Sequence, residues 1–443
     1  MQTSMTTGSP AKSIVSFTLP VLAGNLLQLT YSIADTRIVG TYLGDHALAA
    51  VGATTVLNSL YIGFFMGIAN GFAILTARFY GAANEQKVRC SFAAAFMLGS
   101  ILAVLLAGLT LLFLSPVLHF LNVPDVLFAE ARSYVSIIIG GLLITMLYDI
   151  FLASARAAGD SVTPLLILIL SVGLNILGDL LLLGVLHTGV WGAAAATVGA
   201  QAIALLISAL YILRKYAFFR IGFRDFRKIT GRLIREMLAT GISMGLMSSL
   251  INLGSMILQT AINGLSSSYI VAQSTARKIT EVLMSVFVAF GHTMATYCSQ
   301  NLGAGEHERI RRGMKAGCII TCSWCLVVFL IVWPFSSILV QLITGSRDAV
   351  MIRAATEYLR IDSVLYVLVA LIFIFRNSLQ GLGDRITPLI SSGIEMGGKV
   401  VLTYTLVPAL GYFGVILVEP IVWIVMILPL IVRIKRYVQS DFF

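Results

Sequence analysis

The sequence predicts an all-α polytopic membrane protein whose twelve transmembrane helices form two pseudo-symmetric lobes of six. Composition is the first indication: hydrophobic residues make up 58% of the 443 residues, charged residues make up 11%, and the mean hydropathy is +0.94. Soluble domains carry about 25% charged residues, so this chain lies outside that class. The other two indications are the number of long apolar runs and a repeat of short sequence strings.

Twelve apolar runs, separated by polar connections, are each long enough to cross a bilayer, which takes roughly 20 residues. Several are longer than one crossing and are expected to tilt or to extend beyond the membrane. The polar opening of the chain has no signal-peptide cleavage pattern, so the first run is expected to remain in the protein. The runs cover residues 13–39, 48–79, 92–113, 134–157, 165–186, 190–213, 237–265, 269–302, 314–343, 358–379, 389–410 and 413–432.

Two short strings occur twice at almost the same spacing, which indicates that the second half of the chain is a copy of the first. GDSVTP begins at Gly159 and GDRITP at Gly383, 224 residues later; GAANEQKVR begins at Gly81 and GAGEHERIR at Gly303, 222 residues later. Glycine and aspartate suit a tight turn and proline suits the first turn of a helix, so the GD-x-x-TP strings are predicted to be turns and caps. A duplicated membrane bundle is typical of transporters in which one half rocks against the other.

The break between the two copies is predicted at residues 214–236, a basic and amphipathic segment. This linker is expected to lie along the inner membrane surface. Residues 13–213 are predicted to form an N-terminal lobe with helices 1–6, and residues 237–437 a C-terminal lobe with helices 7–12. Because each lobe has an even number of crossings, the two copies should share one orientation and be related by an axis along the membrane normal.

The net charge of +10 follows a topological pattern. With the N-terminus inside, 21 of the 30 Lys and Arg residues fall in inner loops and ends, whereas the outside holds only Arg132, Arg347, Arg353 and Arg360. This positive-inside bias predicts a multi-pass protein of the cell (inner or plasma) membrane with both termini in the cytoplasm. The charge therefore does not indicate a nucleic-acid partner. Membrane lipids are the expected surroundings, and a monomer is the expected state.

Three of the five cysteines have a spacing that resembles a metal site. Cys318, Cys322 and Cys325 lie in GCIITCSWC, which opens an apolar helix and has no histidine or acidic companion. We therefore expect helix packing, with no structural metal and no disulfide framework. The sequence also has no P-loop and no nucleophile–base arrangement, and its histidines are scattered. Neither a cofactor nor an enzymatic activity is predicted.

Acidic side chains inside apolar runs are the strongest functional candidates, because a charge at mid-bilayer costs about 2.5–3.5 kcal/mol. Asp35 in the first run and Asp179 in the fifth should lie at similar depth. Tyr31 and Asn175 each precede one of these acids by four residues and share its helix face. Thr197 of the sixth run is expected at the same level. These side chains are predicted to bind protons reversibly near neutral pH, or a hard cation such as Na⁺. Helix packing is the alternative interpretation for Asn175 and Asp179.

Two other acids are weaker candidates. Asp149 lies near the middle of the fourth run and could face the same cavity, but Arg156, seven residues later, could be its ion-pair partner. Asp362 lies near the outer end of the tenth run and is expected at the membrane interface. The position equivalent to Asp35 in the second half is Ile257, so this acid is not duplicated. The coupling chemistry is therefore expected mainly in the first half.

The second half has paired charges instead. Arg277 and Glu281 are four residues apart in the eighth run, and Glu395 and Lys399 are four residues apart in the eleventh. Arg376 of the tenth run should lie at a depth comparable to that of Glu395. These residues are predicted to form ion pairs that compensate one another, or to line a cavity.

Together, these features resemble the multidrug and toxic compound extrusion (MATE) family over essentially the whole chain. The resemblance rests on two parallel six-helix lobes, on the doubled loop strings and on Asp35 within IADTRIVG. It is strongest for the DinF-like branch, which has a helix-1 acid, an Asn and an Asp one turn apart in helix 5, and a Thr in helix 6. Asp35, Asn175, Asp179 and Thr197 match these positions. Tyr31 precedes the first acid, as it does in that branch.

The resemblance also implies a bend in helix 1 and places the coupling site in the first half. The family's helix-1 proline, at which bending has been proposed, matches Pro20, whereas Ile242 stands at the equivalent position in the second half. Helix 7 is therefore expected to bend less. The NorM-like branch has acids in helices 7 and 10, but the seventh run has none in its core. A second-half cation site of that type is therefore not expected.

The function that the resemblance implies is multidrug efflux by cation-coupled antiport, with H⁺ as the expected coupling ion and Na⁺ as the alternative. Cationic amphiphilic organic compounds would leave by alternating access between the lobes. The alternative function is a flippase for lipid-linked oligosaccharides, in the related superfamily. Such a flippase would need cations such as Arg277, Lys278 and Arg376 to face its cavity. A major facilitator transporter is disfavoured because GAANEQKVRC replaces the loop expected after the second helix.

Overall fold

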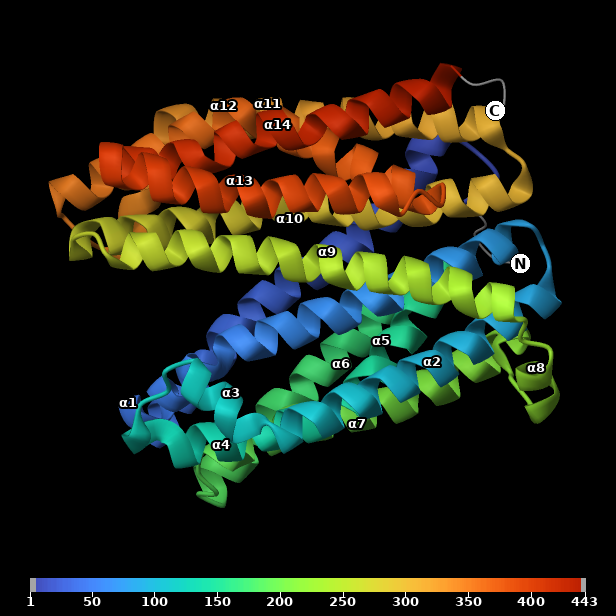
Figure 1. Ribbon diagram of the computed structural model, residues 1–443, viewed down its shortest axis with the longest axis horizontal. Helices are drawn as coiled ribbons and strands as arrows, with labels where there is room; N and C mark the ends of the chain where they lie inside the picture. Colours follow the sequence, from blue (N-terminus) through green and yellow to red (C-terminus); the bar gives the residue numbers. More distant parts are fainter. Residues whose placement is uncertain (1–4, 440–443) are drawn as a thin grey trace. The chain divides into compact units, whose positions relative to one another are not determined.

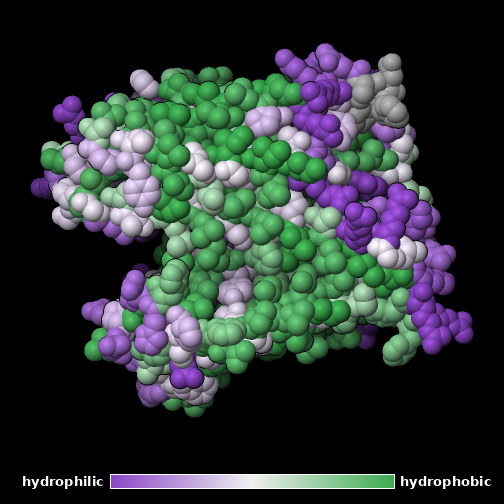
Figure 2. Space-filling model, in the orientation of Figure 1, coloured by the Kyte–Doolittle hydropathy of each residue, from purple (hydrophilic) through white to green (hydrophobic). Residues whose placement is uncertain are grey.

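The computed structural model describes residues 5–439, which form helices and short connections without a β-strand (Figure 1). Residues 1–4 and 440–443, and with them the two termini predicted to be cytoplasmic, lie outside the described residues. Figure 2 shows hydrophobic side chains over the middle of the helices and hydrophilic side chains near the helix ends on the visible face. This distribution is typical of helices that cross a membrane.

The helices follow one another with short connections; η1 is a π-helix and η2 a 3₁₀-helix. The elements are α1 (Pro10–Gly81), α2 (Glu85–Leu112), α3 (Leu114–Phe120), α4 (Asp125–Gly140), α5 (Leu142–Ala157), α6 (Val162–Asp179), η1 (Leu180–Val185), α7 (Val190–Lys215), η2 (Ala217–Phe219), α8 (Phe223–Arg227), α9 (Gly231–Asn263), α10 (Ser267–Ala304), α11 (His307–Thr344), α12 (Ala349–Gly381), α13 (Ile386–Leu410) and α14 (Tyr412–Gln439).

Within the described chain, nine helices are long and apolar enough to cross a membrane, or ten when α4 and α5, which meet at a 45° bend, count as one span. Helix α1 has 72 residues, which at 1.5 Å per residue would be about 108 Å long, several times the roughly 30 Å of a bilayer core. Its backbone leaves the helical region at Gly44, where φ is +78°, a conformation that favours glycine. Thus α1 holds the first two predicted crossings. The eleventh corresponds to α13, which is not among the nine and carries Glu395 and Lys399.

The two GD-x-x-TP loops form the same helix cap, as the sequence predicted. Oδ1 of Asp160 accepts a hydrogen bond from the backbone N–H of Thr163 at 2.9 Å, and Oδ1 of Asp384 accepts one from Thr387 at 3.0 Å. Each threonine hydroxyl donates to the other carboxylate oxygen of its aspartate, at 2.5 and 2.9 Å. The carboxylates therefore satisfy amide groups that the first helical turn would otherwise leave unpaired.

Each of these caps also receives a cation from the last helix of its half. Nζ of Lys215, at the end of α7, lies 2.8 Å from Oδ2 of Asp160, and the hydroxyl of Tyr216 donates to the same oxygen at 2.7 Å. Nε of Arg433, on α14, lies 2.6 Å from Oδ2 of Asp384. Burial opposes ionisation of Asp160, but the hydrogen bonds from Lys215, Thr163 and Tyr216 hold the pKa of this carboxyl below its ordinary value.

Replacing Asp160 with asparagine is expected to destabilise the protein near neutral pH, because the cap remains while the charged partner of Lys215 is lost. A hydrogen bond to a charged group contributes about 1.5–3 kcal/mol to the free energy of unfolding. Since the lowered pKa stabilises the fold above the unfolded value of about 3.9 and this contribution disappears as pH falls below it, the difference from wild type should shrink with acidification. Thermal unfolding of purified protein at pH 7 and pH 4 measures both effects. Glu308→Gln, which removes only an exposed ion pair with Arg312, is the control. A difference that does not change with pH would contradict the prediction.

The described residues pack into two compact units that exchange the beginnings of two helices. One unit comprises Ala23–Gly245; the other comprises Met5–Leu22 and the chain from Leu246 onward. The first turns of α1 therefore pack with the second half of the sequence, and the first turns of α9 pack with the first half. The lobes predicted at residues 13–213 and 237–437 follow the sequence repeat, and the packing departs from that repeat at these two helix beginnings.

In the first unit, α9 reaches α1 through four glycines. A Cβ atom at Gly71 would lie 2.6 Å from Cα of Gly241, and a Cβ atom at Gly67 would lie 2.8 Å from Cα of Gly245. Glycines four residues apart on both helices thus let the two backbones touch, a packing mode typical of membrane helices. Any larger side chain would force the helices apart.

In the second unit, the segment that precedes α1 is fixed against α10 and α11. We call residues 5–9 the N-terminal strap. The side chain of Met5 is only 3% exposed and belongs to the same core cluster as Ile14 and Phe17 of α1. The strap and the first turns of α1 are thus part of the core of this unit.

Candidate functional site

The candidate coupling site lies in the first unit, where α1, α6 and α7 meet. Asp179 is the last residue of α6, and the chain continues directly into the π-helix η1, a structure that often occurs at functional sites. The side chain of Asp179 is fully buried and that of Asn175, one turn earlier, is 3% exposed. Asp35 and Tyr31 on α1 are half-buried. The structure therefore brings the predicted α1 and α6 residues together.

Asn175 is the centre of the hydrogen-bond network. In the orientation that satisfies both ends of its amide, the nitrogen donates to Oδ2 of Asp179 at 3.1 Å and to the hydroxyl oxygen of Tyr31 at 2.7 Å. The amide oxygen lies 3.2 Å from both the backbone nitrogen and the hydroxyl of Thr197 on α7. The hydroxyl of Tyr31 in turn donates to Oδ1 of Asp35 at 3.5 Å. All five predicted side chains are thus linked through one amide.

The carboxyl groups of Asp35 and Asp179 lie within hydrogen-bonding reach of each other. Oδ1 of Asp179 has no other hydrogen-bond partner among the described residues. Two carboxylates in contact repel when both are charged, and a proton shared between their oxygens relieves that repulsion. The same oxygens, with those of Asn175 and Thr197, are the ligands that a hard cation prefers. The site can therefore take up either a proton or a small cation.

Tyr134 adds a further helix, α4, to the site, and the sequence did not predict this residue. It lies close enough to Asp35 and Asp179 to interact electrostatically with both. A tyrosine at the start of the fourth predicted run, in ARSYVSIIIG, was the sequence signal. Its partners became visible only through the packing of α4 against the site.

Asp149 does not join this site through any hydrogen bond found in the described part of the chain. The predicted Asp149–Arg156 ion pair is also absent: no nitrogen of Arg156 approaches the carboxylate within 4 Å in residues 5–439. Nη2 of Arg156 instead donates to Oδ1 of Asn70 on α1 at 3.2 Å. The two side chains still interact electrostatically at longer range. A spacing of seven residues permits a pair but does not exclude a nearer partner on another helix.

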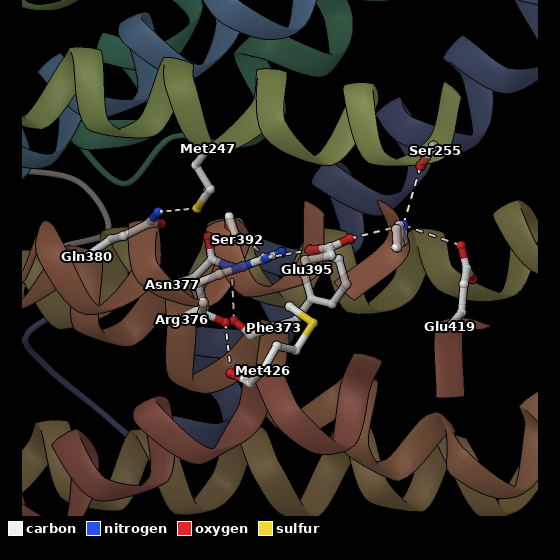
Figure 3. A network of polar contacts seen from close by, with 12 residues as sticks. Met247, Ser255, Phe373, Arg376, Asn377, Gln380, Ser392, Glu395, Glu419 and Met426 are labelled. Atoms are coloured by element: carbon white, nitrogen blue, oxygen red, sulfur yellow. Dashed lines mark hydrogen bonds and ion pairs between the residues drawn. The ribbon is translucent and has the colours of Figure 1, made fainter. Parts of the chain in front are cut away.

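A buried ion cluster occupies the second unit (Figure 3). Nζ of Lys399 lies 3.2 Å from Oε1 of Glu395 and 3.4 Å from Oε1 of Glu419, and it donates to the hydroxyl of Ser255 at 3.4 Å. Nη1 of Arg376 lies 3.5 Å from the other oxygen of Glu395. The charged side chains of these pairs are between 4% and 16% exposed. We call Arg376, Glu395, Lys399 and Glu419 the C-terminal ion cluster.

The structure differs from the predicted ion pairs at two points: it adds Glu419 and it separates Arg277 from Glu281. Glu419 of α14 was missed, although a single acid in the apolar stretch VILVEPIVW was a visible signal. The predicted pair of Arg277 with Glu281 is wrong: Glu281 is exposed, and no ion pair joins the two within the described chain. Arg277 lies close enough to Glu419 of α14 to attract its carboxylate electrostatically, and it repels Lys399. The i,i+4 spacing placed the two residues on one helix face but could not reveal the stronger partner.

Asp362, the other weaker candidate, lies apart from both groups of residues described above in every hydrogen bond and ion pair found in the described chain. It is fully buried in α12 beside Tyr358, and neither carboxyl oxygen accepts a well-formed hydrogen bond from the described residues. Its surroundings are therefore protein side chains, and its predicted depth near the membrane interface stays a prediction. No group of three or more His, Cys, Asp and Glu side chains in residues 5–439 is arranged to hold a metal ion.

The predicted bend at Pro20 is not seen as a break in the helix. Helix α1 includes Pro20, and the non-helical backbone within α1 is at Gly44. Helix α9, which has Ile242 at the equivalent position, contains no proline. Pro20 lies two residues before the point at which α1 passes from one compact unit to the other.

A multi-helical membrane fold with buried charges in both halves is typical of membrane transporters. The MatE family model matches residues 20–181 and again residues 243–405, so the chain belongs to this family. The two matches are the two copies that the repeated strings predicted. The protein is therefore a MATE transporter and not an enzyme.

Named relatives agree with this assignment. The chain is 26% identical over 412 residues to the "Probable multidrug resistance protein YoeA" of Bacillus subtilis (strain 168), covering 90% of this chain and 89% of the relative. It is 26% identical to the "Probable multidrug resistance protein YpnP" of the same strain, covering 87% and 85%. A solved structure described as the "outward-facing conformation of a multidrug resistance MATE family transporter of the MOP superfamily" aligns with a TM-score of 0.87 at 22% identity, over 98% of both chains. The predicted all-α fold of two six-helix lobes is confirmed.

Proposed function

We propose that the protein exports cationic amphiphilic organic compounds by antiport against H⁺, with Na⁺ as the alternative coupling ion. The observation that carries this proposal is the contact between Asp35 and Asp179 inside the membrane, linked through Tyr31 and Asn175. Relatives named as multidrug resistance proteins support the substrate class. Membership of the DinF-like branch, for which Asp35, Asn175, Asp179 and Thr197 match, is part of the proposal.

Coupling follows from competition for the two carboxyl groups. Two carboxyl groups that share one proton carry a net charge of −1, and a second proton makes the pair neutral. The neutral pair holds a cationic compound weakly, whereas the charged pair attracts it. Protonation from outside would therefore release the compound, and loss of the proton to the inside would restore binding. Each positive charge that moves inward across a potential of 100 mV supplies about 2.3 kcal/mol. Alternating access of the site to the two sides of the membrane is required for this cycle.

The proposed orientation places the protein in the cell membrane with both termini in the cytoplasm. The bias of Lys and Arg toward the inner connections supports this topology. Membrane lipids and small organic cations are then the partners, and a monomer contains every residue of the coupling site. No resident cofactor is needed, because the coupling ion is itself transported.

The flippase alternative is disfavoured by the C-terminal ion cluster. A pyrophosphate-linked lipid would need cations that are free to bind it, but Arg376 and Lys399 are paired with Glu395 and Glu419. The carboxyl pair in the first unit has no cation of this kind beside it in the hydrogen-bond network of Asn175 and Tyr31. This arrangement suits a cationic substrate better than an anionic one.

Purified protein in proteoliposomes would test the proposal. A panel of cationic dyes is followed while a pH gradient or a Na⁺ gradient is imposed separately at zero membrane potential. Dye movement driven by the pH gradient alone is the expected result. Movement driven by Na⁺ alone would select the alternative ion, and dye movement that ignores both gradients would refute coupled antiport.

Asp179→Asn is expected to flatten the pH dependence of transport without abolishing dye binding, because Asp35 remains while the partner that shares its proton is lost. The change should appear as a reduced ratio of initial rates between inner pH values of about 6 and 8, a range centred near neutral pH where such sites work. Thr163→Ser, in the first turn of α6, is a control on the same helix. An unchanged pH profile would remove Asp179 from the coupling site.

A further inference from the structure

Arg309 binds three backbone oxygens of the N-terminal strap. The guanidinium of Arg309, on α11, donates to the backbone oxygens of Gly8 at 2.7 Å, Met5 at 3.0 Å and Thr7 at 3.1 Å. Its Nε donates to Oδ1 of Asn301 at 3.1 Å, which fixes the direction of the guanidinium plane. Only arginine has a rigid planar fork with five donors, so lysine cannot reproduce this set of bonds.

Two buried amides complete the anchor. Oε1 of Gln300 accepts a hydrogen bond from the backbone N–H of Met5 at 3.0 Å, and Nδ2 of Asn301 donates to the backbone oxygen of Met5 at 3.3 Å. Both amide side chains are fully buried. The main chain of the strap is therefore held on both its donor and its acceptor side by α10 and α11.

The first turns of α1 continue the same attachment. Ile14 and Phe17 lie in the core of the second unit, and the hydroxyl of Thr18 donates to that of Thr293 on α10 at 2.8 Å. Pro20 follows at once. It has no N–H to donate to the carbonyl four residues earlier, and its ring crowds that carbonyl, so Pro20 weakens the helix between the strap and Asp35.

Beyond Pro20 the same helix belongs to the other unit. The division falls between Leu22 and Ala23, and the arm that follows carries Tyr31 and Asp35. In chain order α1 therefore has a fixed base, a weak point and an arm that bears the candidate proton site. Helix α9 crosses between the units as well, but it has Ile242 instead of proline.

The first copy of the repeat lacks the arginine that forms this anchor. At an offset of 222 residues, the counterpart of Arg309 in the first copy of the loop is Lys87. The side chain of Lys87 is exposed and its Nζ lies 5.7 Å from the ring centre of Phe79. The two copies of this string thus differ at the residue that forms the clamp.

We propose that Arg309 is a positioning residue for coupling. By fixing the base of α1 to the second unit, it makes any movement of the Asp35 arm relative to that unit occur at Pro20. A proton taken up at Asp35, which faces Asp179, Tyr31 and Tyr134, then acts on the angle between the arm and the base. Without the Arg309 contacts, the first turns of α1 can move together with the segment that bears Asp35. Protonation of Asp35 then no longer changes the position of that segment relative to the second unit. This inference rests on the proposed function, because it takes Asp35 as the proton-binding group.

Arg309→Gln is the primary test, studied in the full chain by two independent measurements. Hydrogen–deuterium exchange of the peptide that covers residues 5–17 should become about tenfold faster, the factor that corresponds to roughly 1.4 kcal/mol. In proteoliposomes, the stimulation of dye transport by a pH gradient should fall toward none, while equilibrium dye binding stays unchanged.

Matched variants separate positioning from loss of fold. Arg312→Gln, one turn later on α11 and paired only with Glu308 at the surface, should behave as wild type in both measurements. Arg309→Lys keeps the charge but loses the fork and should be intermediate. Thr18→Val removes a separate part of the attachment and should reduce gradient stimulation in the same direction, so it decides the question even if Arg309→Gln does not fold.

The outcomes are distinct. If hydrogen–deuterium exchange of residues 5–17 is unchanged in Arg309→Gln, Arg309 does not anchor the strap. Faster exchange with full gradient stimulation overturns the positioning role alone. A wild-type protein that ignores every gradient overturns the proposed function together with the coupling role, whereas the exchange measurement still decides the anchor itself.

Discussion

Replacing Asp35 with asparagine should abolish drug efflux, and ethidium efflux from cells that lack other exporters should fall to their background level. The amide is isosteric, so the hydrogen bond with Tyr31 and the helix packing remain. What is lost is the negative charge that attracts a cationic compound and the proton that Asp35 shares with Asp179. Both halves of the proposed exchange therefore fail at once.

Asp45→Asn is the matched control for this variant. It makes the same chemical change on the same helix, at an exposed position next to Gly44. Efflux by Asp45→Asn should equal that of wild type. Efflux by Asp35→Asn at the wild-type rate, at equal expression, would exclude Asp35 from the coupling site.

Replacing Lys399 with methionine should destabilise the protein more than either Asp160→Asn or Arg309→Gln. It leaves Glu419 without the only cation within 4 Å of it among the described residues, and Glu395 with Arg376 alone. Removing one partner of a buried ion pair costs about 3–5 kcal/mol, since the remaining charge is uncompensated. Thermal unfolding followed by size-exclusion chromatography measures the loss.

A second substitution should restore much of that stability. Lys399→Met combined with Glu419→Gln removes a charge of each sign, while Glu395 keeps Arg376. Replacing a buried pair by neutral groups is often close to neutral in free energy. Lys278→Met, at an exposed position on α10, is the control for loss of a lysine. A double variant no more stable than the single one would show that the cluster is not held together by charge balance.

The candidate coupling site was predictable because its residues obey helix periodicity. Tyr31 with Asp35, and Asn175 with Asp179, are four residues apart, and this spacing alone puts each pair on one face. Equal depth in the membrane then brought the two faces to one level. The structure joins these four side chains to Thr197 through the amide of Asn175.

The parts that the sequence did not reveal depend on which helices become neighbours. Glu419 reaches Lys399 from another helix, and it lies close enough to Arg277 for electrostatic attraction. Tyr134 likewise joins Asp35 and Asp179 only because α4 packs nearby. No spacing within one helix carries that information.

The sequence could not predict, for the same reason, that the first turns of α1 pack in the second unit and those of α9 in the first. The repeat assigns all of α1 to the first half and all of α9 to the second, and the predicted lobes have those boundaries. The four glycines that join α1 and α9 are small residues at spacing four, but many other glycines in this chain share that pattern. Only the packed backbone shows which of them touch.

The N-terminal strap has a consequence for the order in which the protein is assembled. Met5 bonds to Gln300, 295 residues later, and Gly8 bonds to Arg309, 301 residues later. The strap is among the first described residues to be synthesised, yet its partners are made when most of the chain is already in the membrane. The base of α1 must therefore wait at the membrane surface until α10 and the start of α11 arrive, and closure of this long-range contact is a late step of biogenesis.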